Sequence, residues 1–579
     1  MSLPTPMSAL VRYAAAIYHL GPRQAARNVL HRATRSARDF GRYARAGGGI
    51  DWSGRARTPF LMHDGGASLA AGRFTAVGLT LEVGDPPSWE RTAPLLWLFN
   101  LHYFAWLPGL ARDAQQRLVL DWIERYPPST ARAGWMNYPL ALRLRNWVAL
   151  LHAGDAWGER DRVLASIEAQ AECLADTLEY HLRGNHLLEA AISLKLLSAC
   201  LRGKAVARWQ RLADSLLEIE LAEQFLLDGG HVERSPMYHA RLAQGLLDLV
   251  NVLPESDETR VRIEQRLPGV LRFLSALRHP DGEIALFNDA AFGIAPDPGA
   301  ILEYAIRLGV DAPAFSSGSF PESGYHVWRA GDAALVVDAG PIGPDYLPAH
   351  AHGDIFSFEL SLGGERVVVD GGTSSYEAGE ERDWARSTRA HNTVEIGGAD
   401  QAEFFGAFRV GRRGRPRDVS ARVSAEGLRL SGWHDGYRRL AGGPVHHREL
   451  ALLPTGALLV WDTVESSRPQ PAVSRVRFAP GARVRLETAD RAVIDAAGVE
   501  LTVHSFGGAL ALETGYYATR FGERVTCPVL ALHKGPRSEL GYAVARAADS
   551  PRIDEGGGEV AGQKVPRLDR RLVAGRKLP

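Results

Sequence analysis

The chain has 579 residues, which is too many for one ordinary hydrophobic core and indicates two large domains, or one very large domain and a smaller one. Hydrophobic residues make up 45% of the chain and charged residues 23%, as in ordinary globular proteins. The 67 basic and 67 acidic side chains cancel, so no overall field favours nucleic acid as a partner. Any attraction for an anionic polymer must therefore be local.

Residues 1–88 are predicted to form a basic helical extension. Residues 1–57 carry ten arginines against Asp39 and Asp51. Such runs are more often solvated faces than binding sites, but this one could face an anionic polymer. Arg12 interrupts the only short apolar stretch and no small-residue cleavage site follows it, so no signal peptide of the usual form is expected. This start predicts a cytoplasmic protein, with the periplasm or cell envelope as the alternative.

A long apolar stretch, "TAPLLWLFNLHYFAWLPGLA", follows at residues 92–111. It is long enough to span a bilayer, but it contains Pro94, Asn100, His102 and Pro108 and is rich in aromatic residues. A pair of buried helices lining a cleft is the better interpretation, and no transmembrane segment is predicted.

Residues 89–315 are predicted to form a helical domain. Apolar residues recur every three or four positions, as in "RWQRLADSLLEIELAEQFLL", with Gly or Pro breaks at intervals. No fixed repeat is visible, which argues against a solenoid and favours an irregular helical barrel or toroid. Cys173 and Cys200 lie in these helical patterns, far from Cys527, so no disulfide framework is implied.

The pattern changes around "APAFSSGSFPESG", and residues 316–579 are predicted to form a β-domain. Segments such as "YHVWRAGDAALVVDAG" alternate apolar and polar residues between glycine turns, which is typical of sandwiches. The Gly-rich, charged C-terminal residues predict a loose, flexible tail. This half also holds a second candidate surface for a polyanion. Its members are Arg409, Arg412, Arg413, Arg415 and Arg417.

Polar residues gather at two places in the helical half. In "RGNHLLEA", Asn185, His186 and Glu189 open a helix, where His186 and Glu189 share one face. A capped helix start with an i,i+3 pair explains this island equally well. In "DGGHVERSPMYHARL", a glycine turn leads into a helix that carries Tyr238, although a tyrosine at such a position more often packs.

A third polar island, "HAHGDIFSFEL", begins at His350 in the β half. If the chain is already extended there, His350, His352 and Asp354 point to one face, although an isolated His-x-His is more often a solvated strand start. Asp370 in "VVVDGGT" and His391 in "RSTRAHNTVEIG" follow. Two imidazoles and one carboxylate on separate strands suit zinc, so His352, Asp370 and His391 are the candidate metal ligands.

Several other chemistries are excluded. No Gly-x-Ser-x-Gly elbow or reactive cysteine supports acyl transfer, and no Walker loop or dinucleotide fingerprint supports a nucleotide-driven reaction.

The ordered set "GNHLLE", "SPMYH", "HAHGDIFSFEL", "VVVDGGTSSY" and "RSTRAHNTVEI" resembles the heparinase II/III-like polysaccharide lyases from about residue 89 into the sandwich. The N-terminal "ALVRYAAAIYHLGPRQAARNVLHR" is similar to the start of members encoded with bacterial exopolysaccharide functions. The resemblance implies an α+β multidomain protein, in which an incomplete α/α toroid precedes an antiparallel β-sandwich and the active site lies between them. Enzymes of the family are normally exported, whereas this chain shows no export signal.

The resemblance also implies roles for individual residues. Asn185, His186 and Glu189 match the family's asparagine–histidine motif, Tyr238 its catalytic tyrosine and His350 its catalytic histidine. His352, Asp370 and His391 match its zinc ligands, which implies one zinc ion, interpreted as structural because it would organise the loop that carries His350.

Positively charged and aromatic residues near these positions are candidates for binding the substrate. Arg234 precedes Tyr238 by one helical turn, and Arg386 and Arg389 precede His391, so all three are predicted to meet substrate carboxylates. Pairing with Asp383 or Glu381 is the structural alternative. Trp135 is the candidate platform for a sugar ring, although core packing is at least as consistent with its pattern. The same two interpretations apply to Trp97, Tyr103, Trp106 and Trp147.

The reaction implied is β-elimination from an acidic polysaccharide. Asn185, with His186, would neutralise the carboxylate of a uronic acid, and Tyr238 and His350 would remove the C5 proton and protonate the 4-O-linked leaving group, in an order set by the epimer. Two rivals stay open. One is a zinc-containing glycan hydrolase with Glu189 or Glu233 as the acid, and the other is a non-catalytic glycan-binding factor in exopolysaccharide biosynthesis.

Overall fold

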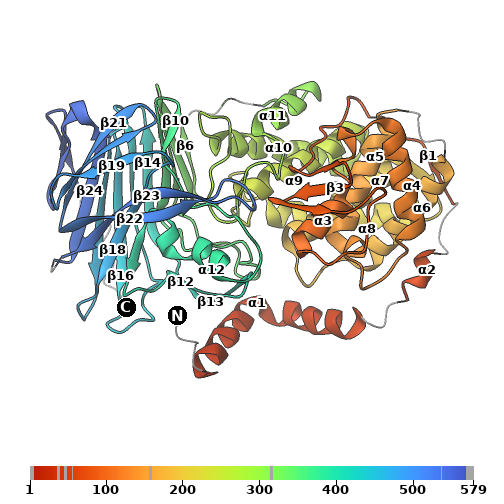
Figure 1. The fold of residues 1–579 in the computed structure, drawn as a ribbon, viewed down its shortest axis with the longest axis horizontal. Helices are drawn as coiled ribbons and strands as arrows, with labels where there is room; N and C mark the ends of the chain where they lie inside the picture. Colours follow the sequence, from red (N-terminus) through yellow and green to blue (C-terminus); the bar gives the residue numbers. More distant parts are fainter. Residues whose placement is uncertain are drawn as a thin grey trace.

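The computed structural model describes residues 6–35, 39–44, 49–54, 56–154, 159–312, 314, 317–535 and 537–568. A helical half precedes a half built from antiparallel sheets, and the change falls between α11 (Pro298–Arg307) and β6 (Gly318–Phe320) (Figure 1). The predicted order of a helical toroid followed by a β-sandwich is therefore confirmed.

The N-terminal extension is only partly helical. The long helix α1 (Pro6–Arg35) kinks at Gly21, whose φ of 71° is easily adopted by glycine. The chain then forms strands between residues 50 and 82, where a helical extension was predicted, because the residues there alternate between buried and exposed in short runs between turns. The elements after α1 are α2 (Gly41–Ala44), β1 (Ile50–Trp52), β2 (Ser68–Ala70), β3 (Arg73–Ala76) and β4 (Leu79–Glu82). Several N-terminal arginines lie outside the described residues.

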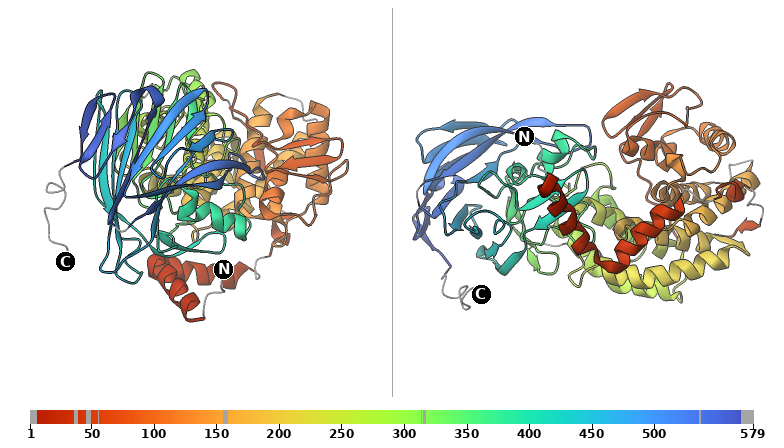
Figure 2. Two further views of the ribbon diagram at one scale, coloured as in Figure 1. Left: turned by 60° about the vertical axis from the view of Figure 1, so that its left-hand side comes forward. Right: turned by 90° about the horizontal axis from the view of Figure 1, so that it is seen from below.

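Helix α1 runs along the outside of the molecule and touches both halves (Figure 2). Its Gln24 amide donates to the carbonyl of His181 in the helical half at 3.1 Å and to that of Tyr346 in the β half at 3.2 Å. Nearer its start, the ring of Tyr13 packs edge-on against Phe405, with ring centroids 5.0 Å apart. The extension therefore joins the two halves.

The helical half is built around one large core of leucines, alanines and tryptophans. Helix α9 begins where Ser235 accepts a hydrogen bond from the Tyr238 backbone N–H and Pro236 occupies the first turn, so the sequence "SP" sets the start of the helix that carries Tyr238. The elements are α3 (Leu95–Tyr103), η1 (Leu107–Gly109), α4 (Arg112–Arg125), η2 (Ala133–Trp135), α5 (Asn137–His152), α6 (Arg160–Asp176), α7 (Gly184–Cys200), β5 (Leu201–Gly203), α8 (Val206–Gln224), α9 (Pro236–Val252) and α10 (Glu258–Ala276).

The apolar stretch at residues 92–111 forms only the short helix α3 and the turn η1. Within the ranges described above, no helix combines the length and the hydropathy that crossing a bilayer requires.

The β half consists of an eight-stranded sheet, a five-stranded sheet and smaller sheets, all with antiparallel pairing. Residues at every second position, such as Leu335 and Val337 or Leu428 and Leu430, point into one shared core between the sheets. The five-stranded sheet runs in the order β10-β9-β8-β7-β6, and the eight-stranded sheet in the order β14-β15-β16-β17-β24-β21-β20-β19.

The remaining bounds are β7 (Tyr325–Ala330), β8 (Ala333–Asp338), β9 (Ser357–Leu362), β10 (Glu365–Val368), α12 (Glu380–Arg386), η3 (Thr388–Ala390), β11 (Val394–Ile396), β12 (Ala402–Phe405), β13 (Arg409–Arg413), β14 (Pro416–Ser424), β15 (Gly427–His434), β16 (Val445–Leu452), β17 (Leu458–Glu465), β18 (Ala472–Arg477), β19 (Arg483–Leu486), β20 (Arg491–Ala496), β21 (Val499–Phe506), β22 (Gly508–Tyr517), β23 (Val525–Lys534), β24 (Glu539–Arg546), η4 (Ala547–Asp549), β25 (Arg552–Ile553), β26 (Gly557–Val560) and β27 (Gln563–Pro566).

The C-terminal residues are not simply a loose tail. Strands β25, β26 and β27 form a small sheet, and Ile553, Val560 and Val565 pack against Leu459 and Trp461. These apolar residues, spaced among glycines and charges, explain why the segment folds back onto the sandwich. Residues 569–579 lie outside the described residues.

Candidate active site

His350 and His352 converge on one buried carboxylate, that of Asp289. Nδ1 of His350 lies 2.8 Å from Oδ2 of Asp289, and Nε2 of His352 lies 2.9 Å from Oδ1. The segment from 350 to 356 is a loop, since β9 begins only at Ser357, so the expected extended strand is absent there. The two imidazoles meet because both turn toward a residue from the helical half.

Asp289 is fixed from several sides. The guanidinium of Arg382 pairs with both of its oxygens, and the hydroxyl of Thr373 donates to Oδ1 at 3.3 Å. Burial alone would raise the pKa of Asp289, but Arg382 and the two histidines hold that pKa well below its usual range. Asp289 is therefore an ionised carboxylate that accepts hydrogen bonds from both imidazoles.

Tyr238 lies against His350, with ring centroids 4.3 Å apart. Its hydroxyl is 3.2 Å from that of Tyr376, which comes from the β half. Burial raises the pKa of Tyr238 well above 10, with smaller contributions from neighbouring groups such as Tyr138. The phenol is therefore protonated in the resting protein.

Asn185 is held by Glu233. Its side-chain Nδ2 lies 3.1 and 3.0 Å from the two Glu233 oxygens, and its backbone N–H donates to Oε1 at 2.6 Å. The second Glu233 oxygen also lies 3.3 Å from Nε2 of His350. In this state the Asn185 amide is already used, while its Oδ1 is buried without a hydrogen-bond partner.

His186 lies beside Asn185 and is more exposed than Asn185. Its ring stacks on Tyr138 with centroids 4.3 Å apart, and its Nδ1 lies 2.7 Å from a Glu179 oxygen. Burial lowers the pKa of His186, but the Glu179 carboxylate outweighs that effect and raises it above 6.5. About a third of the His186 side chain is exposed (32%), so it can meet a ligand.

Glu189 does not lie with these residues. It is fully buried, and its carboxylate pairs with Arg145 at 2.5 Å and with Arg241 at 3.4 Å. Although it shares a helix face with His186 as expected, its oxygens serve ion pairs in the helical core. We therefore assign Glu189 to the support of the site rather than to contact with the substrate.

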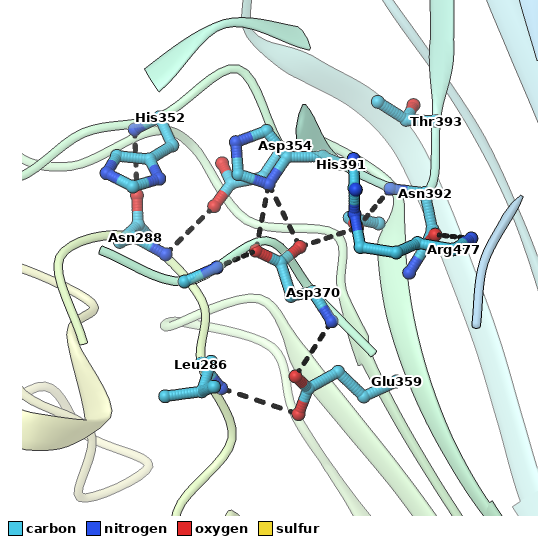
Figure 3. A network of polar contacts seen from close by, with 12 residues as sticks. Leu286, Asn288, His352, Asp354, Glu359, Asp370, His391, Asn392, Thr393 and Arg477 are labelled. Atoms are coloured by element: carbon cyan, nitrogen blue, oxygen red, sulfur yellow. Dashed lines mark hydrogen bonds and ion pairs between the residues drawn. The ribbon is translucent and has the colours of Figure 1, made fainter. Parts of the chain in front are cut away.

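The three candidate metal ligands lie close together at the loop ends of the β half (Figure 3). Nδ1 of His391 is 2.9 and 3.0 Å from the oxygens of Asp370, and the rings of His352 and His391 have centroids 5.3 Å apart. Across the described part of the chain, no three His, Cys, Asp or Glu side chains are placed as a ready metal cage. The cluster is instead arranged as hydrogen-bonded pairs.

The chemistry of these donors nevertheless fits a metal ion. Nδ1 of His352 and Nε2 of His391 are buried and have no hydrogen-bond partner. Burial lowers the pKa of His352 to about 4, so its imidazole is neutral, which is the form that binds metals. Burial, with Asp370 nearby, raises the pKa of Asp354 to about 6, and the Asp370 carboxylate raises the pKa of His391 despite its burial. Glu359 holds Asp370 in place, because its carboxylate accepts the Asp370 backbone N–H at 3.0 Å.

A pocket opens beside Tyr238 and Tyr376. It is partly open to solvent. Helices α3, α5 and α9 contribute Asn100, Tyr138 and Arg241 to its lining, and residues 60–65 of the N-terminal extension form another wall.

Two family models match most of this architecture. "Heparinase II/III N-terminus" matches residues 118–294, and "Heparinase II/III-like, C-terminal" matches residues 312–543. The chain belongs to the heparinase II/III family.

A heparin-sulfate lyase of Pedobacter heparinus is 28% identical over 264 residues, which are 40% of this chain and 38% of that protein. A heparin-sulfate lyase of Bacteroides stercoris is 25% identical over 244 residues, 38% of this chain and 36% of that protein. These matches therefore span less than half of each relative.

Solved structures share the fold of this heparinase II/III protein. A structure titled heparinase III has a TM-score of 0.67 at 16% identity and covers 84% of this chain and 86% of that chain. A mutant of the heparan sulfate lyase HepC from Pedobacter heparinus has a TM-score of 0.60 at 18% identity and covers 98% of each chain. At these identities the similarity establishes the fold.

Two of the arginines predicted to bind substrate are used by the backbone instead. Arg234, 7% exposed, donates to the carbonyls of Ser323, Val232 and Glu322. Arg386, fully buried, donates to those of Ala351, Gly406 and Ala407. Neither pairs with Asp383 or Glu381, the structural alternative expected from sequence. Of the three predicted arginines, Arg389 is the exposed one.

The second candidate surface for a polyanion, the arginines between residues 409 and 417, is also largely neutralised by acidic partners. Arg412 pairs with Glu403, and Arg415 with Asp345. Arg417 pairs with Asp435 at 3.2 Å. From the sequence this run was more often a solvated face than a binding site but could face a polyanion, and the strands of the β half bring acidic residues next to these arginines.

Trp135 is a core residue rather than a platform for sugar. It is 4% exposed, stacks on Trp122 with centroids 5.8 Å apart, and donates to the carbonyl of Tyr126 at 3.0 Å. Trp97, Trp106 and Trp147 are equally buried. Among the aromatic residues proposed from sequence, Tyr103 does line the pocket.

Three residues at the centre of the site were not predicted: Asp289, Arg382 and Tyr376. Asp289 lies in "LFNDA", in the loop between α10 and α11 and far from any other polar island, and its partner Arg382 lies 93 positions away. A single acidic residue in an apolar run was the only local signal. Glu233 was considered only as an acid in a hydrolase, not as the group that holds Asn185.

Proposed function

We propose that this protein is a polysaccharide lyase that cleaves a uronic-acid-containing acidic polysaccharide, in a bacterial exopolysaccharide context, by β-elimination. The observation that carries the proposal is the contact between Tyr238 and His350, with His350 held by the Asp289 carboxylate. This places a protonated phenol and an oriented imidazole side by side next to the pocket. Membership of the family and the names of its heparin-sulfate lyase relatives support the same reaction class.

His350 is suited to be the base. Because ionised Asp289 accepts a hydrogen bond from Nδ1, Nε2 is the nitrogen of His350 that would take the C5 proton, once the substrate displaces its contact with Glu233. Glu233 lies 3.3 Å from that nitrogen, so its carboxylate can stabilise the imidazolium that forms when the C5 proton is taken.

Tyr238 is suited to be the acid. Its raised pKa keeps the phenol protonated, which is the state needed to give a proton to the departing O4. As the C5–H bond breaks, its electron pair forms the C4–C5 double bond, the C4–O4 bond breaks, and O4 takes the Tyr238 proton. A substrate of the opposite epimer would require the two groups to exchange roles, with a positive charge lowering the Tyr238 pKa.

The substrate carboxylate must be neutralised before C5 becomes acidic enough. The His186 imidazolium, sustained by Glu179, supplies a positive charge beside Asn185. The Asn185 amide would contribute a hydrogen bond if the ligand displaces part of its contact with Glu233. His186 is thus the main neutralising group in this proposal.

A zinc ion would be held by His352, Asp370 and His391. When bound, it would supply positive charge between buried carboxylates and fix the loop that carries His350, which is a structural role. His352 and His350 both bind Asp289, so a metal ion that fixes His352 would also help to fix the position of His350, the proposed base.

The direct test incubates the purified protein with a panel of uronate polymers, including heparan sulfate, and follows ultraviolet absorbance from the C4–C5 double bond. Absorbance that grows together with new reducing ends supports elimination. New reducing ends without absorbance would show hydrolysis and overturn the proposal.

A further inference from the structure

The pocket beside Tyr238 is closed at its far end. Tyr238 and Asp248 both line it, and at a helical rise of about 1.5 Å per residue they lie about 15 Å apart along α9. At the Asp248 end, Arg145 pairs with Asp248 at 2.8 Å and with Glu189 at 2.5 Å. The hydroxyl of Tyr304 donates to Asp248 at 3.1 Å from behind. This buried network of ion pairs and one hydrogen bond closes the pocket at that end.

Residues 57–65 form a roof over the pocket, and α9 holds this roof in place. The Gln244 amide donates to the carbonyl of Leu61 at 2.7 Å. The Asn251 side chain accepts from the Thr58 backbone N–H at 3.0 Å and donates to the Thr58 carbonyl at 2.8 Å. These bonds hold the roof against α9, and the roof therefore covers this side of the pocket.

The roof also joins the rest of the wall. Nε2 of His63 lies 3.0 Å from the carbonyl of Gly293, and the neighbouring Ile294 and Pro296 line the pocket. Across the mouth, the β half contributes Phe521.

The turn after β3 closes against the β22–β23 hairpin beside Phe521. A Cβ atom on Gly78 would lie 2.4 Å from the Cα of Gly522, so these backbones touch, and both glycines have positive φ. The two halves of the molecule therefore meet without a gap on this side of Tyr238.

We propose that the pocket receives one end of the substrate chain, so that the protein releases short products from a chain end instead of cutting within the polymer. The inference rests on the proposed function. An internal cut needs polymer to extend from the reacting bond in both directions. Here the roof, the ion-paired end and the glycine contact each close one side of the pocket, and from these contacts we infer that the chain on that side ends inside it.

The test on the unmodified protein uses an oligosaccharide of the polymer it degrades, with a fluorescent label at the reducing end. At low conversion we expect one size of released fragment, and slow loss of polymer viscosity relative to the rise in ultraviolet absorbance. Unsaturated fragments of many sizes at low conversion, with an early fall in polymer viscosity, would overturn the inference and leave the lyase function intact. Absence of any unsaturated product would overturn the proposed function, and this inference with it.

Variants of the roof provide a second test. The double variant His63→Ala, Gln244→Ala removes two contacts of the roof, and Gln115→Ala is the matched control because Gln115 donates to the carbonyl of Leu110 away from the pocket. We expect the double variant to give a severalfold larger share of long products at equal absorbance, and the control to match the parent. An unchanged product distribution in a double variant that folds, as judged by circular dichroism, would show that the roof does not close the site.

Discussion

The Asp289 carboxylate binds His350 and His352 at once, one imidazole on each oxygen, at 2.8 and 2.9 Å. It thereby connects the proposed base to a proposed metal ligand through a single side chain from the helical half. Arg382, from the β half, neutralises the same carboxylate. The arrangement ties the chemistry of the site to the contact between the two halves.

Asp289→Asn should lower kcat by about 10² to 10⁴, because an amide cannot fix the His350 tautomer as a carboxylate does. It should also lower the free energy of unfolding by about 3–5 kcal/mol, since the buried Arg382 loses its partner. Asp281→Asn is the control, since Asp281 pairs with Arg366 at 2.6 Å outside the site and should affect stability alone. Parent-like kcat in folded Asp289→Asn would contradict the role of Asp289.

Protein purified without chelator should contain about one zinc per chain by metal analysis. His352→Ala should lose that metal and lower the Tm, because it removes a ligand. His434→Ala is the matched control, since His434 is fully buried in the sandwich beside His446 and should lower the Tm while keeping the metal. A metal-free parent protein would rule out the zinc proposal.

The KM for an acidic polymer should rise as pH increases through the pKa of His186, which Glu179 raises above 6.5 despite burial. The positive charge is present below that pKa and lost above it. Glu179→Gln should move the rise in KM to lower pH, because the raising carboxylate is gone. The ion pair between His186 and Glu179 also stabilises the folded protein. This stabilisation is lost as pH rises through the raised pKa of His186, because the imidazole loses its charge. It is also lost as pH falls through the lowered pKa of Glu179, because the carboxylate becomes protonated. An identical KM profile in both proteins would exclude this role for His186.

Arg234→Ala should lower the free energy of unfolding by about 1–3 kcal/mol, because three backbone carbonyls lose their donor. Its KM should keep the salt dependence of the parent. Arg389→Ala, a change at an exposed arginine, provides the comparison for a cation that can meet a polyanion. A weaker salt dependence in Arg234→Ala would restore Arg234 as a substrate contact.

The sequence was sufficient to predict the two halves because both signals are local. Apolar residues at helical spacing indicate the buried face of a helix, and apolar residues at alternate positions indicate the buried face of a strand. Neither pattern depends on which element packs against that face. The expectation of helix across residues 1–88 was wrong in part because the short strands β2, β3 and β4 carry only three or four residues each, too few for a clear alternation.

The site was harder to predict because its central contacts join distant positions. His350 and Asp289 are 61 residues apart, and no pattern around Asp289 indicates that partner. Charge was misleading for Arg234 and Arg386, since a sequence does not show whether a guanidinium faces solvent or backbone carbonyls. Trp135 was ambiguous for a similar reason, because a tryptophan near a cleft and one in a core have the same local pattern.

The most direct measurement compares the parent with Tyr238→Phe on the uronate polymer that gives the highest turnover, by the rate of ultraviolet absorbance at saturating substrate. The change removes one hydroxyl from a residue that contacts His350 and Tyr376, so folding and polymer binding should be nearly unchanged. We predict a loss in kcat of at least about 10² with an unaltered Tm, because Tyr238 is the group proposed to protonate the leaving oxygen. Full elimination activity in Tyr238→Phe would contradict the proposed mechanism.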